Sequence, residues 1–338
     1  MKTRRLGRTG LLVSEIGLGT MTFGSMADER ESARILDRAA AAGIDFLDIA
    51  EVYPVPPRPD WAGRSEEIVG RWLEGKPRDK FFVATKIAGP SGGWFVAAVR
   101  SGKTALDRHS IERAVDASLK RLGTDRLDIL FLHRFDALTP LEESMRALED
   151  VVRAGKVIYP AVSNWSAWQT QRGLDIQERS NWARLQVIQP MYNLVKRQAE
   201  VEILPMAEAN GIGVIPYSPA GAGLLSGKYF GNATGRLRSN KMYEARYGDP
   251  WMFEVAEKYV GFCKQKGLHP VSTAIAWVGA HPAVTAPIIG ARNLDQLKDS
   301  LASVDVAMTP ELRKEIADLS RTPPPATDRL EEQKVVAR

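Results

Sequence analysis

The chain has 338 residues, of which 44% are hydrophobic and 26% are charged, and its formal net charge at pH 7 is +5. That length suits one large barrel or two ordinary domains, and the composition is that of a globular protein. The single cysteine, Cys263, excludes an intramolecular disulfide and a metal site built from several cysteines. Basic and acidic residues are interspersed, so the net charge alone does not indicate a nucleic-acid partner.

The sequence shows neither a secretory signal pattern at its N-terminus nor a membrane-spanning pattern. The N-terminus is basic but lacks the apolar segment of a secretory signal. No apolar run approaches the roughly 20 residues that a membrane-spanning helix needs. We therefore expect a cytoplasmic protein that binds neither membrane nor nucleic acid. Because no linker-like stretch interrupts the chain, we expect a single domain over residues 1–338, with an irregular tail after about residue 322.

Apolar runs alternate with amphipathic helical patterns along the chain. The runs predict strands at 15–20, 44–48, 81–86, 127–133, 157–163, 185–189, 212–217 and 284–289. The amphipathic patterns predict helices at 30–42, 65–73, 110–122, 140–154, from about 166, 200–210, 250–266, 271–278, 294–301 and 310–319. The strands are apolar on both faces, as in a parallel sheet covered by helices. The sequence therefore predicts an α/β fold: a single (β/α)8 TIM barrel with a short N-terminal hairpin and long loops at its C-terminal rim.

Polar side chains follow the predicted strands at the point where each strand ends. The residues in these positions are Thr20, Asp48, Lys86, His133, Ser163, Asn164, Gln189, Tyr217, Ser218 and Arg292. Because the carboxyl ends of parallel strands in a barrel meet at one rim, we expect these side chains to gather there. The start of a loop is often polar, which explains about half of them. It does not explain a lysine directly after Val-Ala-Thr or a histidine directly after Leu-Phe-Leu.

Asp48, Tyr53, Lys86 and His133 together suit acid catalysis. A free tyrosine has a pKa of about 10, and a neighbouring cation favours its ionised form. We expect Lys86 to supply that cation, Asp48 to hold the lysine in place, and His133 to orient a carbonyl oxygen. Such a group would reduce a carbonyl and would need a hydride donor. The sequence has four histidines and no HExxH spacing, so no metal site is expected.

These four residues resemble the catalytic tetrad of the aldo-keto reductases, in the order and with intervals similar to those of that family. The resemblance covers nearly the whole chain. It includes the motifs Gly-Leu-Gly-Thr at 17–20, Ser-Glu-Glu-Ile-Val-Gly at 65–70, Leu-His-Arg at 132–134, Val-Ser-Asn at 162–164, Gln-Pro-Met-Tyr-Asn at 189–193, Tyr-Ser-Pro at 217–219 and Ile-Gly-Ala-Arg at 289–292. The proline-rich loop after Tyr53 is similar to that of the Tas-like branch, which is related to the potassium-channel β-subunits.

The resemblance implies that the chain binds NADPH or NADP+, with NADH less favoured. Tyr217 would stack on the nicotinamide, and Arg292 would bind the 2′-phosphate, which suits its planar guanidinium. The residues implied to hold the cofactor are Thr20, Met21, Asp48, Ser163, Asn164, Gln189, Tyr217, Ser218, Pro219, Ala220, Gly221, Lys228, Arg238, Gly290, Arg292, Gln296, Asp299 and Ser300.

Aromatic residues in the predicted rim loops are candidates for contact with the substrate. Beside Tyr53 and His133, these are Trp61, Trp94, Phe135 and Trp165. They favour a small carbonyl substrate that is apolar or contains a ring. The expected function is reversible NADPH-dependent reduction of an aldehyde or ketone to an alcohol. The alternative is an NADPH-binding regulatory protein of the channel β-subunit type, with slow turnover.

Overall fold

The computed structural model describes residues 1–90, 99–102, 104–230, 237 and 240–331. Within these residues, eight parallel strands form one sheet in the order β10-β3-β4-β5-β6-β7-β8-β9. The strands are β3 (Gly17–Gly19), β4 (Phe46–Asp48), β5 (Phe82–Ile87), β6 (Leu127–Leu132), β7 (Val157–Ser163), β8 (Val187–Gln189), β9 (Gly213–Val214) and β10 (Ile288–Gly290).

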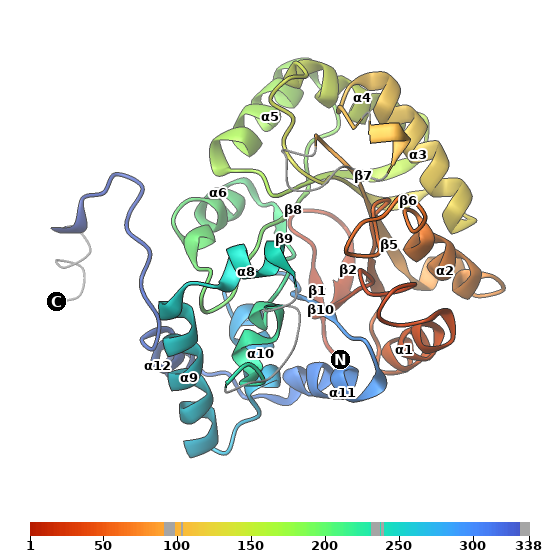
Figure 1. Ribbon diagram of the computed structural model, residues 1–338. Helices are drawn as coiled ribbons and strands as arrows, with labels where there is room; N and C mark the ends of the chain where they lie inside the picture. The colour runs from red at the N-terminus through yellow and green to blue at the C-terminus, as the bar shows by residue number, and fades with distance from the viewer. Residues whose placement is uncertain (91–98, 103, 231–236, 238–239, 332–338) are drawn as a thin grey trace.

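The two edges of this sheet meet, so the sheet closes on itself. Val214 forms a parallel bridge with Val284, and the Ile288 amide donates to the Pro216 oxygen at 2.9 Å. Figure 1 shows the strands at the centre with helices arranged around them. The predicted (β/α)8 barrel is therefore confirmed. The strand predicted at 212–217 is shorter in the structure, because Pro216 has no N–H to donate to a neighbouring strand.

The outer layer consists of helices that pack against the barrel (Figure 1). They are α1 (Glu29–Ala41), α2 (Arg64–Leu73), α3 (Arg108–Leu122), α4 (Leu141–Arg153), α5 (Ala167–Ser180), α6 (Ile203–Asn210), α8 (Lys241–Tyr247), α9 (Pro250–Gln265), α10 (Pro270–Gly279), α11 (Leu294–Leu301) and α12 (Pro310–Ala317). The sequence did not predict α8, which lies in the long excursion after β9. No helix in the described part of the chain has both the length and the apolar composition needed to cross a membrane.

A short hairpin covers the N-terminal end of the barrel, as predicted. Its strands β1 (Thr3–Arg5) and β2 (Leu12–Ser14) are antiparallel. Leu6 and Val13 are fully buried and belong to the same apolar cluster as the side chains inside the barrel. The hairpin therefore leaves the C-terminal rim as the open end, where a site has room.

Alternation along the strands decides which side chains face the barrel interior. In β4, Phe46 belongs to the interior cluster, whereas Leu47 belongs to the outer cluster between strands and helices. Because successive residues of a strand point to opposite faces, Asp48 returns to the interior face two positions after Phe46. The same step leads from interior residues to site residues in the other strands: Ala84 to Lys86, Phe131 to His133, Ala161 to Ser163, Val187 to Gln189, and Ile215 to Tyr217.

Candidate active site

A buried ion pair lies at the C-terminal end of the barrel interior. The Lys86 ammonium donates to Asp48 Oδ2 at 2.7 Å and to the Ile49 backbone oxygen at 2.8 Å. The second Asp48 oxygen accepts a 2.8 Å hydrogen bond from Gln189 Nε2. Burial lowers the pKa of Lys86, and the charge of Asp48 opposes that shift. Strands β4, β5 and β8 thus hold a lysine and a carboxylate in one fixed arrangement.

Tyr53 and His133 lie next to this ion pair. The Lys86 ammonium is 5.0 Å from the centroid of the Tyr53 ring. The Tyr53 and His133 rings meet edge to face, with centroids 6.0 Å apart and planes at 77°. Tyr53 is held in its loop by a 3.0 Å hydrogen bond from its amide to the Ala50 oxygen. The structure therefore brings the four residues of the predicted tetrad together.

The acidity of Tyr53 differs from the sequence-based expectation. Burial and the nearby Asp48 carboxylate raise the pKa of Tyr53 well above 10, whereas the sequence suggested that Lys86 would lower it. The reason is that Asp48 lies 2.7 Å from the ammonium and compensates much of its charge, so the effect of burial dominates. At neutral pH the Tyr53 hydroxyl therefore keeps its proton, which is the state that an acid requires.

His133 is a neutral imidazole at neutral pH. Burial, together with the charges of Lys86 and Arg134, lowers the pKa of His133 to about 3. Its backbone is fixed by two hydrogen bonds: its amide donates to the Ile87 oxygen at 3.0 Å, and its oxygen accepts from Asn164 Nδ2 at 2.9 Å. A neutral imidazole retains one N–H, so His133 can donate a hydrogen bond to a substrate oxygen.

A network of amide and hydroxyl groups continues the site toward β7, β8 and β9. The Tyr217 hydroxyl donates to Asn164 Oδ1 at 2.7 Å, and the Ser163 hydroxyl donates to the Gln189 backbone oxygen at 3.0 Å. Asn164 has φ +59°, a left-handed conformation that asparagine tolerates better than most residues. Burial raises the pKa of Tyr217 to about 12, so this phenol also remains protonated.

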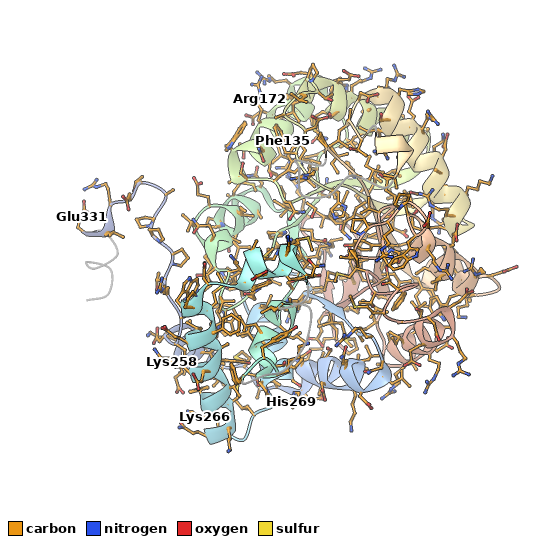
Figure 2. The ribbon with its side chains drawn as sticks, viewed as in Figure 1. Phe135, Arg172, Lys258, Lys266, His269 and Glu331 are labelled. Atoms are coloured by element: carbon orange, nitrogen blue, oxygen red, sulfur yellow. The ribbon has the colours of Figure 1, made fainter. Side chains whose placement is uncertain are left out.

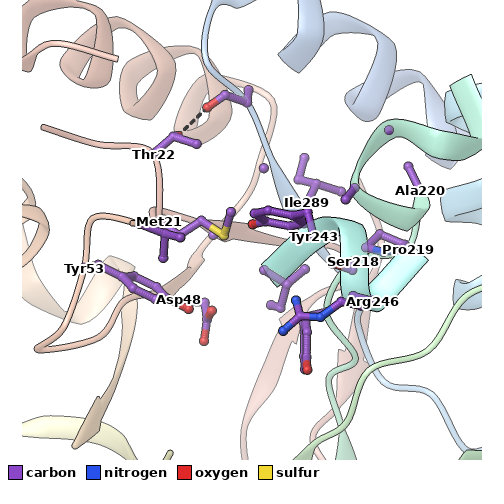
Figure 3. Close-up of a pocket in the computed structure, with 18 of the residues that line it drawn as sticks. Met21, Thr22, Asp48, Tyr53, Ser218, Pro219, Ala220, Tyr243, Arg246 and Ile289 are labelled. Atoms are coloured by element: carbon purple, nitrogen blue, oxygen red, sulfur yellow. Dashed lines mark hydrogen bonds between the residues drawn. The ribbon is translucent and has the colours of Figure 1, made fainter. Parts of the chain in front are cut away.

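These groups line a cavity of about 770 Å³ at the C-terminal rim (Figure 3). The predicted site residues that lie on its wall are Met21, Asp48, Tyr53, His133, Ser163, Asn164, Gln189, Tyr217, Ser218, Pro219, Ala220, Lys228, Gly290, Arg292, Gln296, Asp299 and Ser300. The cavity extends from the C-terminal ends of β4, β6, β7 and β8 to Gln296, Asp299 and Ser300 of α11 and the residues that precede this helix.

The distant end of the cavity has features that suit phosphate groups. Asn293 caps α11 by accepting a hydrogen bond from the Gln296 amide at 3.0 Å, and Arg292 directly precedes that cap. Between the two ends, the chain turns through left-handed conformations at Ser218 and at residues 221–223. A helix N-terminus beside an arginine attracts anions. The cavity wall therefore fits a nicotinamide dinucleotide, with the amide and hydroxyl groups of Ser163, Asn164 and Gln189 at one end and Arg292 beside the α11 N-terminus at the other.

Several predicted residues lie elsewhere. Thr20 is fully buried below the cavity, where its hydroxyl donates to the Asp48 backbone oxygen at 3.1 Å and accepts from Ser65 Oγ at 2.8 Å. Gly221 is buried within the 3₁₀ turn Gly221–Ser226 and does not reach the wall. Trp94 and Arg238 lie outside the described residues.

Three of the predicted aromatic substrate contacts are not on the cavity wall. Trp61 packs under the Arg58 guanidinium, whose Cζ is 4.5 Å from the ring centroid. Trp165 is buried and meets Phe135 edge to face, with centroids 5.0 Å apart, and Phe135 also contacts Trp168 of α5. Phe135 and Trp165 stabilise their loops by packing against each other, because burial of a large apolar ring is favourable.

Residues of α8 line the cavity although the sequence did not single them out. They are Met242, Tyr243, Ala245 and Arg246, and Figure 3 shows Arg246 and Tyr243 projecting into the cavity. The sequence does contain a signal for this helix: Tyr243 and Tyr247 are four residues apart, which places them on one helix face. Both are buried in the structure. Arg134, directly after His133, is another residue of the wall that the sequence did not indicate.

Fold and site together define an oxidoreductase that acts on carbonyl and alcohol groups. The model of the "Aldo/keto reductase family" matches residues 15–321, and the chain belongs to this family. It is 36% identical to an oxidoreductase named YrpG of Bacillus subtilis over 327 residues, which are 94% of this chain and 96% of YrpG. It is 34% identical to the protein Tas of Escherichia coli over 336 residues, 94% of this chain and 96% of Tas.

A further relative is a probable voltage-gated potassium channel subunit beta of Oryza sativa. It is 32% identical over 346 residues, which cover 97% of this chain and 99% of that protein. The likeness to Tas and to the channel β-subunits, expected from the loop after Tyr53, is therefore confirmed. Enzymes of this family use a nicotinamide cofactor and act on small carbonyl compounds.

Proposed function

We propose that this enzyme reduces an aldehyde or ketone to an alcohol with NADPH, and that Tyr53 is the proton donor. The observation that carries the proposal is the buried Lys86–Asp48 pair directly beside the Tyr53 ring and the neutral His133. A fixed cation, a protonated phenol and a neutral hydrogen-bond donor are the groups that carbonyl reduction needs at one point.

Each residue has a separate role in the proposed reaction. NADPH, when bound, supplies the hydride that is added to the carbonyl carbon. The Tyr53 hydroxyl gives its proton to the carbonyl oxygen, and the N–H of His133 donates a hydrogen bond to that oxygen while negative charge develops on it. The Lys86 ammonium then stabilises the Tyr53 phenolate, and Asp48 keeps the ammonium in position. In the reverse direction the phenolate accepts the proton of an alcohol.

The residues proposed to bind the cofactor line the wall of the cavity. Ser163, Asn164 and Gln189 offer hydroxyl and amide groups to a nicotinamide carboxamide, and the Tyr217 ring offers a face for stacking. The loop from Ser218 to Lys228 would hold the pyrophosphate. Arg292 and the first turn of α11 would hold the 2′-phosphate, which distinguishes NADPH from NADH.

A panel of aldehydes and ketones with NADPH tests the proposal, with loss of NADPH absorbance as the measurement. Tyr53→Phe removes the transferred proton, so turnover should fall by several orders of magnitude while NADPH binding is kept. Tyr259→Phe is the matched control: it removes a buried hydroxyl that donates to the Pro270 oxygen and is not on the cavity wall, and it should leave turnover unchanged. Turnover of Tyr53→Phe within about threefold of the wild type would exclude Tyr53 as the acid. If the wild type binds NADPH but reduces no carbonyl, the regulatory role of a channel β-subunit becomes the better explanation.

The coenzyme preference has its own test at Arg292. A charge-assisted contact contributes about 1.5–3 kcal/mol, which corresponds to roughly one to two decades in affinity. Arg292→Ala should therefore raise the KM for NADPH by that factor and leave the KM for NADH nearly unchanged. Lys298→Ala, an exposed position on the same helix, is the control. If both KM values rise together in Arg292→Ala, the role of Arg292 is structural.

A further inference from the structure

Two arginines lie on the cavity wall at the catalytic end. Arg246 comes from α8, and Figure 3 shows its side chain extending into the cavity in the direction of Asp48 and Tyr53. Arg134 directly follows His133. Burial raises the pKa of Tyr53 and the positive charge of Arg246 opposes that rise, whereas the charge of Arg134 adds to the lowering of the pKa of His133 by burial and by Lys86. Each arginine thus acts on a different member of the tetrad, and both lie where a substrate would approach.

Within the described residues, neither arginine has a carboxylate at ion-pair distance. Other half-buried arginines do, for example Arg78 at 2.7 Å from Asp128 and Arg121 at 2.6 Å from Glu66. The guanidinium of Arg246 instead lies 5.7 Å from the centroid of the Tyr243 ring. A cation in a partly enclosed cavity loses hydration, which costs free energy, and an anion bound beside it compensates that cost. These two arginines are therefore ready to bind an anionic group.

The cofactor does not account for these two charges. The groups suited to its phosphates, Arg292 with the α11 N-terminus and the loop up to Lys228, form the other parts of the wall. The catalytic end holds Tyr53 and His133, where the carbonyl of a substrate must lie. The three predicted aromatic contacts Trp61, Phe135 and Trp165 do not line this end. Among the described residues, this end offers two guanidinium groups and none of the three rings Trp61, Phe135 and Trp165.

We propose that the physiological substrate is a small carbonyl compound that carries a carboxylate or a phosphate group, bound by Arg246 and Arg134. This inference rests on the proposed carbonyl reduction. The planar guanidinium binds either anion through two parallel hydrogen bonds. The two arginines fix the anionic end of the substrate, and the carbonyl at the other end then lies against the Tyr53 hydroxyl and the His133 ring.

Matched pairs of substrates test the proposal. The pairs are butyraldehyde with succinic semialdehyde, benzaldehyde with 4-carboxybenzaldehyde, and glyceraldehyde with glyceraldehyde 3-phosphate. The wild type should favour the anionic member of at least one pair by roughly tenfold to a hundredfold in kcat/KM, the range of a charge-assisted contact. The first two pairs report a carboxylate and the third a phosphate, so the preferred pair identifies the group.

Variants then assign the preference to the two arginines. Arg246→Gln and Arg134→Gln should each reduce the anionic-to-neutral ratio of kcat/KM by about tenfold or more, and Arg246→Lys should keep part of it. The ratio is the proper readout because a change in the acidity of Tyr53 affects both members of a pair equally. The control is Arg172→Gln, on α5 at the outer surface (Figure 2), which should not change the ratio.

The possible outcomes separate this inference from the proposed function. If the neutral and anionic members of every pair are reduced with equal kcat/KM, the substrate inference is wrong and carbonyl reduction stands. A higher KM for NADPH in Arg246→Gln with an unchanged ratio would also overturn it, since Arg246 would then bind the cofactor. If the wild type reduces no carbonyl, the proposed function fails. Calorimetry with the NADPH complex then decides on the anion site: succinate should bind more tightly than butyramide, and equal binding would overturn the site.

Discussion

At the scale of single residues, both carboxylate oxygens of Asp48 are bound by buried side chains. One oxygen accepts from Lys86 and the other from Gln189, and all three side chains are buried. A buried charge is tolerated when its partners satisfy it and is costly when one of them is removed. The ion pair is therefore a device for holding an ammonium at a fixed point in the barrel, whatever its net contribution to stability.

Lys86→Met should both abolish turnover and destabilise the protein. The substitution leaves the Asp48 carboxylate buried without its cation, which costs about 3–5 kcal/mol in the free energy of unfolding. In the double variant Lys86→Met/Asp48→Asn the uncompensated charge is gone, so much of the stability should return while turnover stays low. Denaturant unfolding and NADPH consumption measure the two effects. If Lys86→Met alone is as stable as the wild type, water must reach the Asp48 carboxylate, and the ion pair is not desolvated.

The pH dependence of the reaction follows from the shifted pKa values of Tyr53 and His133. The pKa of His133 is lowered to about 3, and that of Tyr53 is raised well above 10. Neither group changes its protonation between about pH 5 and pH 9, so kcat for reduction should be flat over that range. Alcohol oxidation needs the Tyr53 phenolate, so its kcat should rise with pH. A reduction profile that falls with a pKa near 6.5 would mean that His133 titrates normally and is exposed to water.

At the scale of elements, Glu66 connects the helical layer to the strand that carries Lys86. It is fully buried on α2, accepts from Thr85 Oγ1 of β5 at 2.6 Å, and pairs with Arg121 of α3 at 2.6 Å. Thr85 is the neighbour of Lys86 and points to the opposite face of β5. The carboxylate thus fixes the strand from its outer side while the barrel interior holds Lys86.

Glu66→Ala should therefore cost far more than the loss of a surface ion pair. It leaves the Arg121 guanidinium and the Thr85 hydroxyl without their acceptor, and we expect a loss of about 3–5 kcal/mol in the free energy of unfolding. Glu29→Ala is the control, because Glu29 pairs with Arg71 at the same 2.6 Å but both side chains are 50% exposed. Its cost should be about 0.2–1 kcal/mol. Equal losses in the two variants would show that burial does not strengthen the Glu66 contacts.

At the scale of the whole molecule, the closed barrel leaves little space between its strands. Gly17 of β3 lies against Phe46 of β4 and Ile288 of β10, and all three are buried at the point where first and last strands pair. A Cβ at Gly17 would lie 2.5 Å from Phe46 Cδ1 and 2.7 Å from Ile288 Cδ1. Close approach of the side chains, rather than an unusual backbone angle, requires glycine here.

Gly17→Ala should destabilise the entire barrel by about 1–3 kcal/mol, because overpacking an interior position displaces neighbouring side chains. Gly10→Ala, in the hairpin loop where nothing lies within 4 Å of the added methyl, is the matched control and should change stability little. Thermal unfolding of both variants measures the difference. A Gly17 variant with wild-type stability would show that Phe46 and Ile288 repack without strain.

The sequence by itself predicted the barrel and the four residues Asp48, Tyr53, Lys86 and His133, which the structure brings together. Continuous apolar strands alternating with helices indicate a parallel barrel, and the two-residue period of a strand places Asp48, Lys86 and His133 above the interior residues Phe46, Ala84 and Phe131. This information is local, since each strand carries its own site residue. For that reason it could be read without knowing how the strands pack.

Only the tertiary structure decided the acidity of Tyr53 and the placement of Arg134 and Arg246 on the cavity wall. The pKa of Tyr53 depends on burial and on the compensation of Lys86 by Asp48, which are properties of distances between separate elements. The position of Arg246 depends on how α8 folds over the rim, and the burial of Trp165 depends on its packing against Phe135. Pairwise electrostatics and packing act through space, so the order of residues along the chain did not reveal them.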